Sequence, residues 1–115
     1  MTVTIYHNPR CSKSRQTLAL LEERGVSPRV VDYLKTPPSA AELKVMLNKL
    51  GLGPLDLLRE GERLYAELGL KERDLDDDAL IALMVANPIL IERPIVVSRG
   101  KAALGRPPES VLEIL

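Results

Sequence analysis

The chain has 115 residues, a length typical of one domain, and 45% of them are apolar, which excludes a disordered polypeptide. Sixteen basic residues balance sixteen acidic ones, so the sequence predicts neither a general nucleic-acid-binding surface nor one for anionic membranes. A single cysteine and a single histidine exclude an internal disulfide, an internal dithiol cycle and a structural zinc site.

The first third of the chain predicts a strand, a helix and a second strand. Residues 2–6 alternate polar and apolar side chains and are rich in β-branched residues, which is typical of a strand. Apolar residues on one helical face, followed by Gly25, predict a helix over about residues 12–24. Residues 30–34 are the second predicted strand, and this succession favours parallel pairing with a right-handed crossover.

The middle of the chain, residues 35–87, predicts only helices. Ser39 begins a capping-box sequence before a run of apolar residues with helical periodicity. Asp76 is placed to cap a later helix, which ends before Pro88. Two shorter helical turns are expected between these helices.

The last part of the chain predicts a β-hairpin followed by a helix. Residues 94–98 are the first strand of the hairpin, Arg99 and Gly100 are its turn, and residues 101–104 are the second strand. Prolines and an acidic residue then predict the first turn of a final helix. The predicted organisation is one domain, residues 1–115, with a βαβ half (1–34), a helical insert (35–87) and a ββα half (88–115).

Reactive side chains concentrate in the sequence HNPRCSKSR, residues 7–15, between the first strand and the first helix. Cys11 lies at or beside the helix N-terminus, where unpaired N–H groups and the helix dipole favour a thiolate over a thiol. Arg10, Lys13 and Arg15 add positive charge, and the same features attract an oxyanion. The loop therefore predicts a reactive thiol beside an anion site; a small buried cysteine among solvated charges is the competing interpretation.

Spacing separates this loop from other cysteine and phosphate motifs. A phosphatase-type loop would place an arginine where Thr17 stands, and a dithiol motif would place a second cysteine at Ser14. The sequence contains neither of two glycine-rich phosphate-binding motifs, Gly-x-x-x-x-Gly-Lys-Ser/Thr and Gly-x-Gly-x-x-Gly. What remains is a monothiol Cys-x-x-Ser sequence at the start of a helix.

Short sequence segments that follow one another over essentially the whole chain carry a resemblance to a known family. They are residues 4–9, 11, 14–15, 33–34, 36–38, 57–59, 67–70, 87–91, 93–97 and 105–107. With these segments the chain resembles the thioredoxin-like arsenate reductases of the glutaredoxin-coupled class, in a short bacterial subgroup. The resemblance implies an α/β, thioredoxin-like fold: a small mixed four-stranded sheet flanked by helices, with a helical insertion in the middle of the chain.

The resemblance also implies roles for single residues. Cys11 would be the nucleophile, and Arg59, Arg93 and Arg106 would hold the oxyanion, to which the planar donor fork of arginine is well suited. Pro94 would be the cis-proline that faces the active cysteine in this fold. No metal site is expected.

Four other residues near Cys11 are expected to support it. His7 either tunes the thiolate or simply ends the strand, and these two interpretations stay open. Asn8 is expected to fix the loop by hydrogen bonds to the backbone. Ser14 either bonds the thiolate or stabilises the helix start, and Arg15 is a candidate contact to the ligand.

The implied reaction is the reduction of arsenate to arsenite through a cysteinyl-arsenate intermediate on Cys11. Because the chain has no second cysteine, the electrons must come from outside. Glutathione is expected as co-substrate and glutaredoxin as the partner that resolves the mixed species, with no bound cofactor. Such a protein would contribute to arsenical resistance.

Two other functions remain open at this point. One is a related glutathione-dependent thiol-disulfide oxidoreductase that uses the same monothiol site. The other is a non-enzymatic, thioredoxin-like regulator that binds RNA polymerase, although such regulators usually carry a Cys-x-x-Cys pair. We expect a monomer in the cytoplasm, where a free thiol stays reduced, with neither nucleic-acid nor membrane partners.

Overall fold

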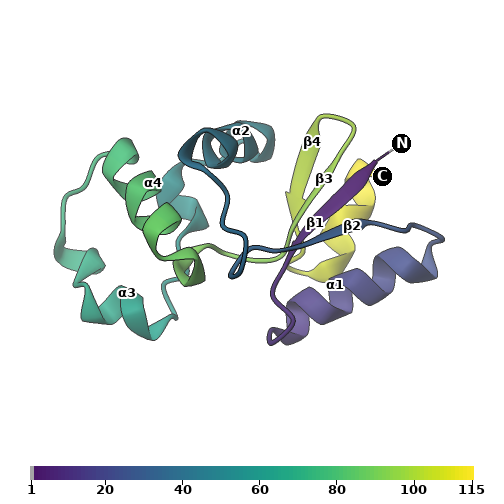
Figure 1. The fold of residues 1–115 in the computed structure, drawn as a ribbon, viewed down its shortest axis with the longest axis horizontal. Helices are drawn as coiled ribbons and strands as arrows, with labels where there is room; N and C mark the ends of the chain where they lie inside the picture. The colour runs from purple at the N-terminus through teal and green to yellow at the C-terminus, as the bar shows by residue number, and fades with distance from the viewer. Residues whose placement is uncertain (1) are drawn as a thin grey trace. The chain divides into compact units, whose positions relative to one another are not determined.

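The computed structural model of the chain describes residues 2–115 (Figure 1). These residues form two compact units. One extends to Thr36 and includes Arg93–Leu115, and the other is Pro37–Glu92. The first unit contains a β-sheet, and the second is built of helices. None of the helices in residues 2–115 has the length and apolar run that crossing a membrane requires.

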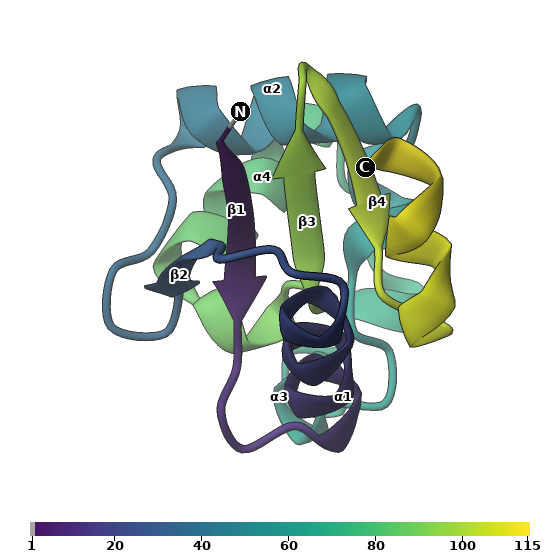
Figure 2. The same ribbon diagram turned by 90° about the vertical axis from the view of Figure 1, so that its right-hand side faces the viewer.

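The sheet of the first unit is mixed, and its four strands lie in the order β2-β1-β3-β4 (Figure 2). The strands are β1 (Val3–His7), β2 (Arg29–Asp32), β3 (Ile95–Ser98) and β4 (Lys101–Leu104). β1 pairs with β2 in parallel, whereas the β1–β3 and β3–β4 pairs are antiparallel. The expected four-stranded mixed sheet and the parallel pairing of the first two strands are therefore confirmed.

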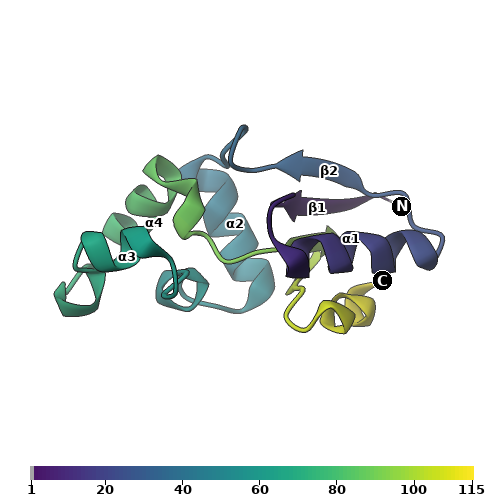
Figure 3. The same cartoon turned by 90° about the horizontal axis from the view of Figure 1, so that it is seen from below.

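Two helices cover one face of this sheet, α1 (Ser12–Glu23) and the C-terminal η4 (Pro108–Ile114) (Figure 3). Alternate residues of β1 are buried, as expected for a strand with one face against the core. The buried core between these layers consists of Val3, Ile5, Leu21, Val96 and Val111. Each such side chain stabilises the fold by about 1.5–3 kcal/mol when it leaves water.

The predicted final helix is present as η4, and it is a 3-10 helix. Its apolar residues Pro108, Val111 and Ile114 are three positions apart, and all three are buried or pack against the core. A 3-10 helix has three residues per turn, so this spacing places them on one line. Contact with the core therefore favours the tighter helix.

Two boundaries show how local chemistry sets the ends of strands. The hairpin turn is confirmed: Arg99 and Gly100 both have positive φ, 54° and 76°, as a two-residue turn between twisted strands requires. The second strand was predicted to run over residues 30–34, but β2 ends at Asp32. There the Asp32 carboxylate accepts the Leu34 N–H at 3.1 Å, which begins a turn in place of the strand.

The helical unit contains three α-helices and three 3-10 turns. They are α2 (Ala40–Leu50), η1 (Pro54–Leu57), α3 (Arg63–Glu67), η2 (Leu70–Glu72), α4 (Asp77–Ala86) and η3 (Pro88–Leu90). Both predicted caps are confirmed: Ser39 forms a capping box with Glu42, and Asp76 accepts the Ala79 N–H at 2.8 Å. Just after η1 and η3, Leu58 and Ile91 form an isolated antiparallel bridge.

Candidate functional site

Cys11 is the N-cap residue of α1, at the end of the loop that follows β1. Its N–H donates to the Asn8 carbonyl at 3.0 Å, and its carbonyl accepts the Arg15 N–H at 3.0 Å. The side chain is nearly buried, with 9% of its surface exposed. The predicted position of the cysteine at the helix start is confirmed.

The Cys11 sulfur is surrounded by donors that favour its anionic form. Burial alone raises the pKa of Cys11, because a thiolate is poorly solvated in the interior. The backbone N–H of Ser14, the charge of Arg93, the backbone N–H of Lys13 and a hydrogen bond from the Arg93 side chain outweigh it. The pKa of Cys11 therefore lies below its ordinary value, so the thiol is activated toward nucleophilic attack.

The positive charge beside the thiol comes from a distant part of the chain. The sequence predicts that Arg10, Lys13 and Arg15 supply this charge, but their side chains are exposed. The guanidinium that lowers the pKa of Cys11 is instead that of Arg93, which is nearly buried. This correction follows from tertiary structure, because water and salt screen exposed charges strongly and a nearly buried charge much less.

Arg93 reaches Cys11 because of how the strands pair. Tyr6 of β1 lies opposite Ile95 of β3, so the residues just after β1 approach those just before β3. The Arg93–Pro94 peptide is cis, as the resemblance implies. The Arg106–Pro107 peptide is cis as well, which the sequence analysis did not anticipate.

The register of the hairpin also brings Arg93 and Arg106 together. Ile95 pairs with Leu104, so the positions before and after these two strands continue opposite one another. The Gly105 N–H donates to the Pro94 carbonyl at 2.9 Å, and Arg106 Nη1 donates to the Arg93 carbonyl at 3.4 Å. Two of the three arginines singled out from the sequence therefore stand at one end of one hairpin.

The hydroxyl of Ser14 forms hydrogen bonds to residues that precede Cys11. Ser14 Oγ lies 2.6 Å from His7 Nδ1 and accepts the Asn8 N–H at 3.0 Å. Asn8 Oδ1 in turn accepts the Arg10 N–H at 3.0 Å, which confirms that Asn8 bonds the loop backbone. Ser14 therefore presents its backbone N–H to Cys11 while its hydroxyl binds the opposite side of the loop.

His7 and Arg15 complete this network. Burial lowers the pKa of His7; the charge of Asp32 raises it and that of Arg15 lowers it again, and the result lies below the ordinary histidine value. The imidazole is therefore neutral at pH 7. The Arg15 guanidinium donates to the Pro9 carbonyl at 2.8 Å, which fixes the loop backbone from the helix side.

Arg59 belongs to the helical unit. Its backbone N–H donates to the Leu90 carbonyl at 2.8 Å. Its side chain forms an ion pair with Glu62, with 3.2 Å between Nη1 and Oε2, and both side chains are about four-fifths buried. The guanidinium thus has a carboxylate partner within its own unit.

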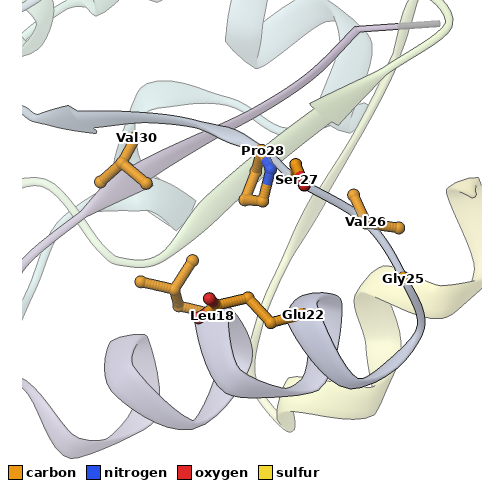
Figure 4. Close-up of a pocket in the computed structure, with 7 residues that line it drawn as sticks. All are labelled: Leu18, Glu22, Gly25, Val26, Ser27, Pro28 and Val30. Carbon is orange, nitrogen blue, oxygen red and sulfur yellow. The ribbon is translucent and has the colours of Figure 1, made fainter.

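A cavity of about 400 Å³ lies at the opposite end of α1 (Figure 4). It is lined by Leu18, Glu22, Gly25, Val26, Ser27, Pro28 and Val30. The twelve residues of α1 separate this end from Cys11 by about 18 Å, given the rise of an α-helix. With a carboxylate and no cation in its lining, this cavity does not suit an oxyanion.

Within residues 2–115, no three His, Cys, Asp or Glu side chains are grouped so that they would hold a metal ion. The chemical resources of the site are thus a nucleophilic sulfur, the N–H groups of a helix start and the paired ends of a hairpin that carry two arginines. This combination can attack an electrophilic centre while it binds negative oxygen atoms.

Comparison with known proteins gives consistent results. The model of the ArsC family matches residues 6–114. The chain is 53% identical over 114 residues to an arsenate reductase of Neisseria meningitidis serogroup A, covering 98% of this chain and 97% of the relative. It is 59% identical over 114 residues to the uncharacterized protein YfgD of Escherichia coli K12, covering 98% and 96%. A solved structure of an arsenate reductase from Vibrio cholerae superposes with a TM-score of 0.95 at 58% identity, covering 100% and 98%. The thioredoxin-like α/β fold is therefore confirmed.

Proposed function

This chain belongs to the ArsC family, and we propose that it is an arsenate reductase that works through a covalent intermediate on Cys11. The observation that carries the proposal is the hydrogen bond from Arg93 to a thiol whose pKa is lowered at a helix start. Relatives that are named arsenate reductases and match nearly the whole chain support arsenate as the substrate.

Arsenate would bind at the ends of the hairpin and of α1. Arg93 and Arg106 lie at one end of the hairpin, and each guanidinium offers a planar fork of donors that suits a tetrahedral oxyanion. Backbone N–H groups at the start of α1 add uncharged donors, and the helix dipole favours a negative ligand. Arg59 is the third arginine that the resemblance assigns to the oxyanion.

The first step is a nucleophilic substitution at arsenic. The Cys11 thiolate forms a sulfur–arsenic bond, and one arsenic–oxygen bond breaks as that oxygen leaves as water after protonation. Arsenic remains As(V) in this cysteinyl-arsenate intermediate. Arg93 would neutralise charge on both reactants, because it already contacts the sulfur and stands beside Arg106.

The electrons then come from two external thiols, because the chain holds no second cysteine. Glutathione forms a second sulfur–arsenic bond, and a second oxygen leaves as water. A glutaredoxin thiolate attacks the glutathione sulfur, and the pair of electrons from the broken sulfur–arsenic bond stays on arsenic as As(III). Water then cleaves the bond to Cys11 and releases arsenite. The sum is one arsenate and two thiols giving arsenite, one disulfide and one water.

No cofactor is required by this sequence of steps, and glutathione is a co-substrate. The reaction needs a pool of reduced thiols, which is typical of the cytoplasm. We therefore propose a cytoplasmic enzyme. Its partners would be arsenate, glutathione and a glutaredoxin.

A coupled assay tests this function. It contains arsenate, glutathione, glutaredoxin, glutathione reductase and NADPH, and it measures NADPH oxidation that depends on arsenate. We expect turnover by the native protein and none by Cys11→Ser. Arg106→Ala should lower kcat/KM for arsenate by about ten- to hundredfold, since it removes charged hydrogen bonds worth about 1.5–3 kcal/mol.

The matched control is Arg29→Ala, which removes an exposed arginine from β2 in the same unit and should leave kcat/KM unchanged. Absence of arsenate-dependent turnover in a native protein whose Cys11 still reacts with iodoacetamide would contradict the proposed function. Turnover of a glutathione mixed disulfide without arsenate turnover would identify a general thiol-disulfide oxidoreductase instead.

A further inference from the structure

A cavity of about 340 Å³ borders the loop that carries Cys11. Its lining residues come from two segments of the sheet unit and are Asn8, Pro9, Arg10, Asp32, Leu34 and Lys35. The first three directly precede Cys11 in the chain, and the others are the last residue of β2, Asp32, and two residues of the turn that follows it. A volume of this size lies at the lower end of the range for small-molecule sites, about 300–1,000 Å³.

The cavity combines two cations with one carboxylate. Arg10 and Lys35 are exposed, whereas Asp32 is half-buried. The backbone under each charge is fixed: Arg10 N–H donates to Asn8 Oδ1 at 3.0 Å, and Lys35 N–H donates to the Asp32 carbonyl at 3.1 Å. Neither cation has a part in the proposed chemistry of arsenate. The lining therefore combines two cations and one carboxylate, on segments of fixed backbone, that the reaction at Cys11 does not use.

Resting on the proposed function, we propose that this cavity is the binding site for glutathione. Glutathione carries two carboxylates, one ammonium group and a central thiol, so its charges are the complement of those in the lining. Arg10 and Lys35 would pair with the two carboxylates, and Asp32 with the ammonium group. Pro9 and Leu34 supply apolar surface for the peptide stem.

The position of the cavity fits the step in which glutathione reacts. That step forms a sulfur–arsenic bond on the arsenic held by Cys11 and releases one oxygen as water, so the attacking thiol must reach the Cys11 loop. The cavity wall includes Asn8, whose carbonyl accepts the Cys11 N–H at 3.0 Å. Glutathione in the cavity would thus lie against the loop residues that directly precede Cys11.

The carboxylate in the lining argues against a second site for a plain oxyanion. Phosphate or arsenate would gain from Arg10 and Lys35, but Asp32 would repel it. A zwitterionic ligand gains from all three groups. Electrostatic complementarity of this kind selects a ligand more than it adds affinity, so single changes should have moderate effects.

The binding test uses S-methylglutathione, which keeps the charges of glutathione but cannot react. It is titrated into the ¹⁵N-labelled full chain while amide resonances are recorded. We expect saturable shifts at the amides of residues 8, 10 and 32–35, and at least about fivefold weaker binding in Lys35→Glu. Lys101→Glu makes the same charge change on β4, away from the cavity, and should bind normally.

Three outcomes of the titration would overturn the proposal. The first is that shifts occur only at other residues, and the second is that Lys35→Glu and Lys101→Glu bind equally well. The third is that inorganic phosphate produces the same shifts at the same concentrations, which would identify an anion site. Arg10→Glu is a second variant on the other cation and should weaken binding in the same way.

The kinetic test separates this inference from the proposed function. In the coupled assay, Lys35→Glu should raise KM for glutathione at least about fivefold and leave KM for arsenate unchanged. Arsenite formation with the neutral thiol 2-mercaptoethanol should be the same in both proteins. A native protein without arsenate turnover would refute the proposed function, and the titration would still decide the cavity. Normal turnover with equal KM for glutathione in both proteins would refute the cavity assignment alone.

Discussion

Replacing Gly105 by alanine tests the packing that holds the hairpin end against α1. A Cβ atom at this position would lie 2.7 Å from Pro94 Cγ and would collide with Thr17 Oγ1. Thr17 and Pro94 are both fully buried, so neither side chain can move into solvent to relieve the contact. The hairpin and the helix must therefore separate.

The size of the effect follows from these contacts. Overpacking a buried site costs about 1–3 kcal/mol, and the lower chain entropy of unfolded alanine offsets about 0.5 kcal/mol of that. A net loss of about 1–2 kcal/mol in the free energy of unfolding corresponds to a decrease in Tm of about 4–8 °C for a domain of this size. Because Gly105 lies between Pro94 and Arg106, kcat/KM for arsenate should fall as well.

Thermal unfolding followed by circular dichroism measures this loss. Gly61→Ala is the matched control, because no heavy atom lies within 4 Å of its Cβ position, and its Tm should change little. Adding Thr17→Ala to Gly105→Ala should cost less than the sum of the single changes, since it removes one colliding side chain. A Tm of Gly105→Ala within about 1 °C of the native value would refute the packing argument.

Two further predictions concern charge at the site. Arg93→Ala should raise the pKa of Cys11. The rate at which iodoacetamide alkylates Cys11 should then reach its plateau at a higher pH and be lower at pH 7. Arg106→Ala is the control and should leave the pH dependence of alkylation unchanged. If Arg59 binds the oxyanion as proposed, Glu62→Gln should lower KM for arsenate about two- to fivefold, because the Glu62 carboxylate, 3.2 Å from the Arg59 guanidinium, would no longer compete with arsenate for it.

For each of these two predictions, one result would contradict the reasoning. An unchanged alkylation profile in Arg93→Ala would show that the charge near Cys11 has another source. For the arsenate affinity, Glu67→Gln makes the same change in an exposed ion pair of the same unit, 3.0 Å from Arg63, and should have no effect. Equal KM values in the two glutamate variants would exclude competition at Arg59.

The sequence was sufficient to place the hairpin and the start of the first helix. The Arg99-Gly100 turn between two short apolar runs sets the hairpin register, and that register alone places Arg93 opposite Arg106. Their proximity was therefore accessible from the sequence by counting outward from the turn. The position of Cys11 at a helix start was accessible in the same way, from the strand before it and the periodicity after it.

The residue whose positive charge lowers the pKa of Cys11 could not be found from the sequence in this way. It depends on the antiparallel pairing of β1 with β3, two strands that are distant in the chain, and on the burial of Arg93. Sequence proximity favoured the loop cations instead, because it cannot distinguish a solvated side chain from a buried one. The sequence also did not define the type of the final helix, because contacts with the core select the period of three in η4.

The sequence also could not show which atoms of Ser14 form hydrogen bonds. The Cys-x-x-Ser spacing pointed to Ser14 near the sulfur, but gave no means to separate hydroxyl from backbone. In the structure the hydroxyl binds His7 and the Asn8 N–H, and the backbone N–H binds Cys11. Such a division depends on side-chain rotamers within a folded loop.

The most direct test of arsenate reduction at Cys11 is a measurement of arsenic speciation. Reduced protein is incubated with arsenate, glutathione and glutaredoxin, and arsenite is quantified after chromatographic separation. The native protein should form many equivalents of arsenite per Cys11, and Cys11→Ser should form no more than the protein-free mixture. Equal arsenite from both proteins, or none from a native protein with an alkylatable Cys11, would contradict arsenate reduction at this cysteine.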